Sequence, residues 1–195
     1  SNTVLGASIS YILASQVFVS ATLTIPAGTT IFALPVPTGV AAPALVVVKG
    51  GALVATGSAT MPITFTSVLA ESALVSSATA STDSNENAIT LGERGKWGGL
   101  ILLGNAPTNV PTTTQIEGIT GYTYGGTNPT ESSGSLQYVR VWHGGAIVGA
   151  NNEINGITFG GVGSGTTVAY CEVAFNLDDG FEFFGGTVNV KYLSV

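Results

Sequence analysis

Charged residues, cysteine and histidine are all scarce in this sequence of 195 residues. Charged residues make up only 8% of the chain, against about 25% in most soluble proteins. The net charge is −6 with only five Lys or Arg, which excludes a basic patch for nucleic acid. Cys171 is the only cysteine, so no disulfide can form within the chain, and His143 is the only histidine. We therefore expect Cys171 to be a small core residue rather than a nucleophile.

Long hydrophobic runs and helical periodicity are absent as well. No run of about 18 uninterrupted apolar residues occurs, which excludes a membrane-spanning helix. Between Leu136 and Val195 no window carries apolar residues at the i, i+3, i+4, i+7 spacing of an amphipathic helix. This stretch contains short runs of Val, Ile, Thr, Tyr and Phe instead, separated by glycine pairs such as Gly160-Gly161 and Gly185-Gly186. Such runs are typical of β-strands bounded by tight turns.

Several of these strand-like runs resemble one another. Residues 136–141 align with residues 168–173 and, less well, with residues 188–193. Residues 156–161 align in the same way with residues 180–186. A chain that repeats a strand–turn unit without helices between the copies is most simply a β-solenoid, in which each coil rests on the last.

The alignments also predict the size and register of the coils. Residues 23–31 align with residues 45–53 at an offset of 22, with leucines, apolar residues and glycines matched, which predicts a coil of about 22 residues. The matched glycines would turn a corner where a side chain does not fit. The alignment of residues 136–141 places Arg140 beside Glu172 on the neighbouring coil, where an exposed pair would contribute at most about 1 kcal/mol.

Three separated motifs, at residues 95–109, 116–118 and 151–193, resemble a family of secreted bacterial right-handed parallel β-helix proteins. The members are usually described as lipoproteins or surface proteins. The resemblance covers roughly Leu23 to the end of the chain. It implies an all-β fold, a right-handed parallel β-helix with loop excursions, in an extracellular or cell-surface setting. It implies no particular reaction.

The chain length predicts a single β-helix domain over residues 1–195. Residues 1–20 form an N-terminal strand segment that we expect to be exchangeable with a neighbouring subunit. Residues 68–95 are polar, small and without period, and are predicted to form a surface loop. The sequence begins with Ser1 and shows no signal peptide, which fits a processed mature protein or a fragment.

The acidic residues Asp178, Asp179 and Glu182 form the one concentrated candidate site. Neighbouring carboxylates repel one another, and either a bound cation or a raised pKa relieves the repulsion. Hard oxygen ligands suit Ca²⁺, so one hypothesis is a calcium site at these residues, with no other cofactor required. The alternative is a turn in which Asp178 and Asp179 accept hydrogen bonds from backbone N–H groups.

Trp97 and Trp142 are the candidate carbohydrate-binding residues, because an indole ring can stack on a sugar. Each lies at a boundary between a strand and a turn, where an aromatic side chain commonly covers the edge of a core, and we favour this packing role. His143 has no other histidine, cysteine or carboxylate near it in the sequence, and we expect it at the surface or at a corner.

A catalytic role finds little support in the sequence. Asp178-Asp179 resembles the aspartate pair of polygalacturonase-like β-helix hydrolases, but the histidine and Arg-Ile-Lys motifs of those enzymes are absent. A lyase would need a basic residue, and few are available. The candidates are Arg94, Lys96, Arg140 and Lys191. We therefore expect no enzymatic activity.

The function favoured by the sequence is that of an extracellular structural protein. We expect the β-helix to assemble head to tail with copies of itself into a filament or surface layer, because both ends are apolar and strand-like and no cap is evident. The alternative is a calcium-dependent protein that binds or degrades polysaccharide, with glycans as partners. The residues predicted to form the assembly contacts are Val4, Leu5, Ile9, Tyr11, Ile12, Leu13, Leu193 and Val195.

Overall fold

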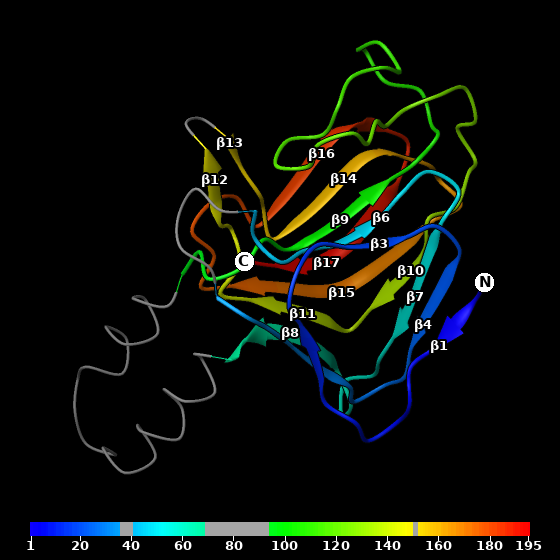
Figure 1. Cartoon of the computed structure of the whole chain (residues 1–195). Helices are drawn as coiled ribbons and strands as arrows, with labels where there is room; N and C mark the ends of the chain where they lie inside the picture. Colours follow the sequence, from blue (N-terminus) through cyan, green and yellow to red (C-terminus); the bar gives the residue numbers. More distant parts are fainter. Residues whose placement is uncertain (36–40, 69–93, 150–151) are drawn as a thin grey trace.

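The computed structural model describes residues 1–35, 41–68, 94–149 and 152–195, and its elements wind into a right-handed parallel β-helix (Figure 1). A ten-stranded sheet bends along its length into two faces, and a five-stranded sheet forms the third. All pairings within these sheets are parallel. The predicted fold class is therefore confirmed. Among the described residues, no helix is long and apolar enough to cross a membrane.

The chain visits the three faces in the same order on successive coils. The first face contains β1 (Thr3–Val4), β4 (Thr22–Ile25), β7 (Ala52–Thr56) and β10 (Gly134–Gln137). The second contains β2 (Tyr11–Leu13), β5 (Thr30–Ala33), β8 (Ile63–Ser67) and β11 (Val139–Trp142). The long strands β15 (Thr167–Ala174) and β17 (Asn189–Ser194) contribute to both. The third contains β3 (Val17–Val19), β6 (Leu45–Val47), β9 (Leu100–Leu103), β14 (Ile157–Val162) and β16 (Phe181–Gly186).

Alternate side chains of the strands point inward and form one continuous core. Phe65 on the second face and Phe159 on the third are its largest strand residues, and both are buried. Trp97 fills the corner between these faces, with its ring stacked 6.3 Å from that of Phe65. Because each coil supplies apolar residues from all three faces, the core runs along the whole axis of the helix. The free Cys171 lies within it, as predicted, and burial raises the pKa of its thiol to about 11.

In the coils that contain β10 and β11, β15, and β17, the corner between the first and second faces is turned by a single residue, whereas residues 5–10, 26–29 and 57–62 turn it in the earlier coils. Tyr138, Tyr170 and Tyr192 adopt the left-handed conformation, with φ of 50°, 56° and 57°. Their rings stack on one another with centroid distances of 4.6 Å and 4.5 Å. We call these three residues the tyrosine ladder. The conformation strains a residue with a β-carbon, and the stacking of the rings compensates for that strain at each step of the ladder.

The two alignments within residues 136–186 are confirmed. Leu136 pairs with Val168, and Arg140 pairs with Glu172 as predicted. Ile157 pairs with Phe181, as the alignment of residues 156–161 requires. The weaker alignment is wrong by two residues, because Val168 of β15 pairs with Val190 of β17 and not with Val188.

The predicted coil of 22 residues is wrong for the N-terminal part. Leu23 pairs with Leu53, not Leu45, whereas Leu45 pairs with Val17 and Leu100. Residues 23–31 and residues 45–53 each contain a strand, a glycine turn and another strand. Residues 23–31 lead from the first face to the second, whereas residues 45–53 lead from the third face to the first. The alignment therefore matched two different corners of the same helix.

A long connection between β9 and β10, residues 104–133, folds over the outer surface of the third face (Figure 1). It brings Ile116, Ile119 and Tyr124 onto outward-pointing Ile101 and Leu103 of β9, and together they form a second hydrophobic cluster. A short antiparallel hairpin, β12 (Ile147–Gly149) and β13 (Asn152–Glu153), projects from the corner between the second and third faces. Among the described residues, the long connection thus encloses part of the outer surface of the third face.

The structure tests little of the predicted domain organisation. Residues 3–19 form the first coil and pair with the second coil of their own chain through β1, β2 and β3. The surface loop predicted for residues 68–95 lies almost entirely outside the described residues. Exchange of the N-terminal segment with a neighbour stays a prediction.

Candidate functional site

Glu182 lies on the outer surface of the third face, at the edge strand β16. It pairs across the sheet with Thr158 of β14. Its carboxylate accepts a hydrogen bond from the side-chain amide of Asn155, which is itself buried. Asn155 lies two residues before β14, where the chain enters the third face. A buried amide therefore holds the carboxylate in place on an otherwise apolar sheet surface.

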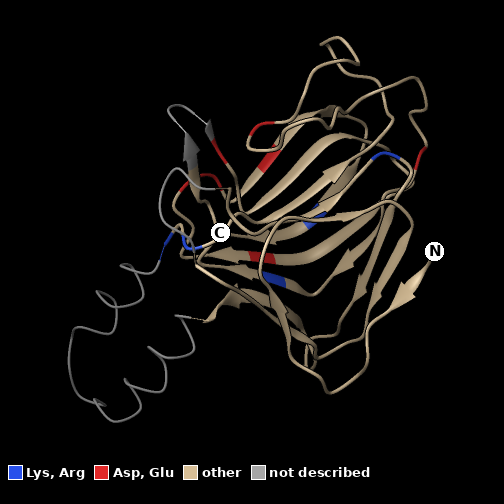
Figure 2. Ribbon diagram, in the orientation of Figure 1, with Lys and Arg blue, Asp and Glu red and all other residues tan. Residues whose placement is uncertain are grey.

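Three other carboxyl groups surround Glu182. Asp178 and Asp179 lie in the turn that leads into β16, and Glu117 belongs to the long connection over the third face. Figure 2 shows how the acidic segments gather around β16 and its preceding turn. Partial burial, and next the charges of Glu117, Asp179 and Asp178, raise the pKa of Glu182 from its usual 4.5 to about 7, although the Asn155 hydrogen bond opposes the rise. The predicted acidic site is therefore an electrostatically coupled group, to which Glu117 adds a member.

The turn that contains Asp178 and Asp179 is held through its backbone carbonyls. The side-chain amide of Asn176 donates to the carbonyl oxygens of Asp178 at 3.0 Å and Asp179 at 2.8 Å. The backbone N–H of Gly156 donates to the Asp179 carbonyl at 2.9 Å. The two carboxylates are exposed to solvent. The turn is thus hydrogen-bonded, but with its carbonyls as acceptors where the sequence suggested its carboxylates.

A hollow of about 570 Å³ opens further along β16, beyond Glu182. Phe184, two residues beyond Glu182 on the same side of β16, lines it together with Tyr124 from the long connection. The two rings lie 5.8 Å apart at an angle of 59°. Burial, and secondarily the charge of Glu182, raise the pKa of Tyr124 above its usual value, so its hydroxyl remains a neutral donor. An aromatic surface beside hydrogen-bonding groups is the combination that sugar-binding sites use.

The two tryptophans do not form a sugar-binding surface together. Trp97 is fully buried, and its indole N–H donates to the backbone carbonyl of Trp142 at 2.8 Å. A sugar has no access to it, so the carbohydrate-binding role is wrong for Trp97 and the packing role is correct. Trp142 is partly exposed and donates to Glu172 at 2.7 Å, while the Arg140 guanidinium lies 5.6 Å from its ring centre. Arg140 and Glu172 are thus neighbours that both contact the indole between them.

His143 is placed at a corner, as expected, but is not a surface residue. It is buried and adopts a left-handed φ of 62°. Its ring stacks on Phe175 of the next coil, with centroids 4.9 Å apart. Of the two expected positions, surface or corner, the corner is therefore the observed one, and the ring is buried there because successive coils stack at this corner.

The predicted calcium ligands do not converge in this structure. In the part of the chain that the structure describes, no three His, Cys, Asp or Glu side chains come close enough to hold a metal ion. A site at Asp178, Asp179 and Glu182 would therefore need the turn to rearrange on binding, and it stays a prediction.

If calcium binds there, a chelator should lower the melting temperature of calcium-treated protein, because a ligand of the native state stabilises it. Asp179→Ala should abolish that difference, whereas Glu172→Ala, which removes a carboxylate from another face, should retain it. Differential scanning calorimetry with and without EDTA makes the comparison. A wild-type melting temperature indifferent to the chelator would leave only the hydrogen-bonded turn.

The raised pKa of Glu182 predicts a pH-dependent stability. Between the usual pKa of 4.5 and the folded value of about 7, the native state keeps a proton that the unfolded state has lost. The free energy of unfolding should therefore fall as the pH rises through this range. Glu182→Gln should flatten the fall, and above pH 7 the variant should be more stable than the wild type.

Urea titrations at several pH values between 4 and 8 measure this effect. Glu172→Gln is the matched control, since it removes a carboxylate outside the acidic group and should leave the wild-type profile in place. If the unfolding free energies of Glu182→Gln and the wild type changed with pH in the same way, Glu182 would not be the group that keeps a proton in the native state.

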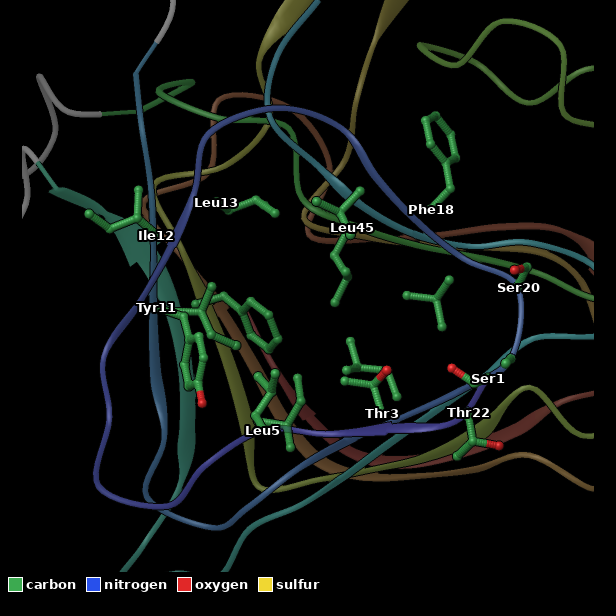
Figure 3. Close-up of a pocket in the computed structure, with 17 residues that line it drawn as sticks. Ser1, Thr3, Leu5, Tyr11, Ile12, Leu13, Phe18, Ser20, Thr22 and Leu45 are labelled. Carbon is green, nitrogen blue, oxygen red and sulfur yellow. The ribbon is translucent and has the colours of Figure 1, made fainter.

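The opening of the first coil is also hollow. A cavity of about 380 Å³ is bounded by the strands of the first two coils and lined mainly by apolar side chains (Figure 3). Leu5, Tyr11 and Leu13 line it, and Leu13 is buried. Of the other predicted assembly residues, Val4, Ile9, Ile12 and Val195 are exposed and Leu193 is half-buried.

Comparison with known families gives one result. Residues 1–77 and 81–195 match the profile of a family described as a pectate-lyase-like beta helix domain. Neither the comparison with curated proteins nor that with solved structures found a match.

Proposed function

The chain belongs to the family of pectate-lyase-like β-helix domains, and from that premise we propose that it is an extracellular polysaccharide-binding protein. Its sugar site would lie on the outer surface of the third face, where Tyr124, Phe184 and Glu182 meet. The observation that carries the proposal is the hollow lined by these two aromatic rings beside a carboxylate held by a buried amide.

The charge of the site favours neutral glycans. Glu117, Asp178 and Asp179 act on Glu182 strongly enough to raise its pKa, so an anionic uronate placed there would meet the same repulsion. The whole chain is acidic as well, with a net charge of −6. An acidic polysaccharide would bind only if a cation such as Ca²⁺ bridged its carboxylates to those of the protein. Binding of neutral glycans should therefore not need calcium, whereas binding of acidic polysaccharides should depend on it.

Catalysis by the same site is part of the proposal's test. The family takes its name from lyases, so its match does not support the expected absence of activity. A carboxyl group with a pKa of about 7 can protonate a leaving oxygen near neutral pH. Hydrolysis would further require a second carboxylate on the other side of the sugar, and Asp178, Asp179 and Glu117 are the acidic residues near enough to influence Glu182.

A glycan screen tests the proposal. Purified protein is assayed by calorimetry on neutral and acidic polysaccharides, with calcium or EDTA, and products are examined for new reducing ends and unsaturated sugars. We expect binding to neutral glycans, weakened at least about tenfold by Phe184→Ala, or about 1.4 kcal/mol. Tyr192→Ala removes an exposed aromatic ring at the opposite corner and should leave binding unchanged. Equal binding by both variants would place the sugar elsewhere.

Self-assembly is the second candidate, favoured by the open, apolar first coil. At one end β1, β2 and β3 each pair with only one strand among the described residues, and at the other end β16 and β17 do the same. Such edges can add a strand from another molecule, and head-to-tail contacts of this kind generate filaments unless they close a ring. Stacking of whole coils needs no detachment of residues 3–19, whereas the predicted exchange does.

Deletion of residues 1–15 separates these possibilities. The full chain should form polymers visible by electron microscopy and the shortened chain should not. Polymers that persist after the deletion would contradict assembly through the N-terminal segment, and a full chain that sediments as a monomer at high concentration would contradict self-assembly altogether.

A further inference from the structure

The tyrosine ladder places three phenol rings in parallel along one edge of the helix. Tyr138 and Tyr170 stack at an angle of 4° between their planes, and Tyr170 and Tyr192 stack at 12°. Because the backbones are in register at this corner, equivalent atoms of adjacent rings lie one above the other.

The ladder is accessible from solvent. Tyr170 is 43% exposed and Tyr192 is 62% exposed, and Tyr138 is half-buried. Partial burial in the stack, and secondarily the neighbours Tyr192 and Tyr138, raise the pKa of Tyr170 above its usual value. The phenol is therefore neutral before oxidation, and its oxidation to a phenoxyl radical removes a proton together with the electron.

We propose that Tyr170 is an oxidative crosslinking site, which couples to Tyr138 or Tyr192 on an adjacent coil to form a dityrosine bridge. The oxidant is hydrogen peroxide acting through a haem peroxidase. Each phenol loses one electron and one proton, and the two phenoxyl radicals join through the ring carbons next to their hydroxyl-bearing carbons. The hydrogen on each joined carbon then moves to the oxygen and restores the phenol. In total two tyrosines lose two hydrogen atoms, and one peroxide becomes two waters.

The geometry favours this product over coupling between molecules. The rings that must join are held in contact before oxidation, so their effective concentration far exceeds that of a second molecule in dilute solution. Tyr170 is needed for either bridge, because it lies between Tyr138 and Tyr192, which are two coils apart. The exposed edges of the rings give them room to tilt out of the parallel stack as the new bond forms.

Treatment of dilute protein with peroxidase and hydrogen peroxide tests the proposal. We expect dityrosine fluorescence in the monomer band of a denaturing gel, a mass lower by two hydrogens, and a crosslinked peptide pair that contains Tyr170. Tyr170→Phe, which keeps the ring in the stack, should reduce the crosslink in monomers to background. The melting temperature of crosslinked wild type should rise, because the bridge restricts the unfolded chain.

Two further variants keep the test decisive if Tyr170→Phe folds poorly. The double change Tyr138→Phe and Tyr192→Phe leaves Tyr170 in place but should also abolish the bridge. Tyr122→Phe is the matched control, because Tyr122 stacks on Phe18 and not on a tyrosine, and it should leave the bridge intact. Crosslinks found only between molecules, or undiminished in Tyr170→Phe, would overturn the proposal.

Discussion

Replacement of Trp97 by alanine should lower the free energy of unfolding by about 3–5 kcal/mol, the usual loss for a fully buried aromatic side chain. The indole is completely buried, packs on Phe65 and donates a hydrogen bond to the Trp142 carbonyl. Alanine would leave a cavity at the corner between the second and third faces and an unpaired carbonyl. Urea unfolding followed by circular dichroism measures the loss.

Trp142→Ala is the matched control for this prediction. Its side chain is partly exposed, so a smaller cavity forms and the loss should be clearly smaller than for Trp97. Trp97→Phe should fall between alanine and the wild type, because phenylalanine fills part of the space but cannot donate the hydrogen bond. If Trp97→Ala were no worse than Trp142→Ala, the assignment of Trp97 to the core would be wrong.

Replacement of Gly134 by alanine should destabilise the protein by more than about 3 kcal/mol, since backbone strain of about 1–3 kcal/mol adds to a steric clash. Gly134 begins β10 with φ of 114°, and a β-carbon there would lie 2.1 Å from the carbonyl oxygen of Leu53 on β7. That contact can be relieved only if β7 and β10 move apart. Because these strands join neighbouring coils, the change separates the helix in its middle.

Gly50→Ala isolates the contribution of strain in this second experiment. Gly50 also has a positive φ, of 85°, but a β-carbon there would meet no atom within 4 Å. The Gly50→Ala variant should therefore lose about 1–2 kcal/mol of unfolding free energy, which is the strain of the left-handed conformation alone. Thermal unfolding of the two variants gives the comparison, and equal losses would mean that the close approach of the strands at Gly134 does not limit stability.

The fold could be predicted where a residue keeps the same position on successive coils. The alignment of residues 136–141 with 168–173 succeeded because Tyr138 and Tyr170 turn the same corner and the flanking apolar residues occupy the same core positions. The alignment of Leu23 with Leu45 failed because strand–glycine–strand patterns occur at more than one corner. Local sequence shows that a corner exists, but only the pairing with neighbouring coils shows which one it is.

The candidate site could be predicted only in part for a related reason. Glu182 and its acidic neighbours in the turn are close in sequence, so their repulsion was evident. Glu117, Tyr124 and Asn155 were missed, because they approach Glu182 only through the path of residues 104–133 and the pairing of β14 with β16. These contacts join residues that are far apart in the sequence, so no local sequence motif indicates them. The burial of Trp97 likewise depends on where the corner lies.

The single-residue turns of the tyrosine ladder fix the length of the corner between the first and second faces in the C-terminal coils, whereas residues 5–10, 26–29 and 57–62 turn the same corner in the earlier coils. At the ladder the chain passes from one face to the next through Tyr138, Tyr170 or Tyr192 alone, so an added residue would shift the inward and outward alternation of the following strand. The corner between the third and first faces already holds connections as different as the short turn at Gly50 and residues 104–133. New peptide segments can therefore be grafted at that corner, while the tyrosine ladder gives the C-terminal coils a rigid spine opposite the third face.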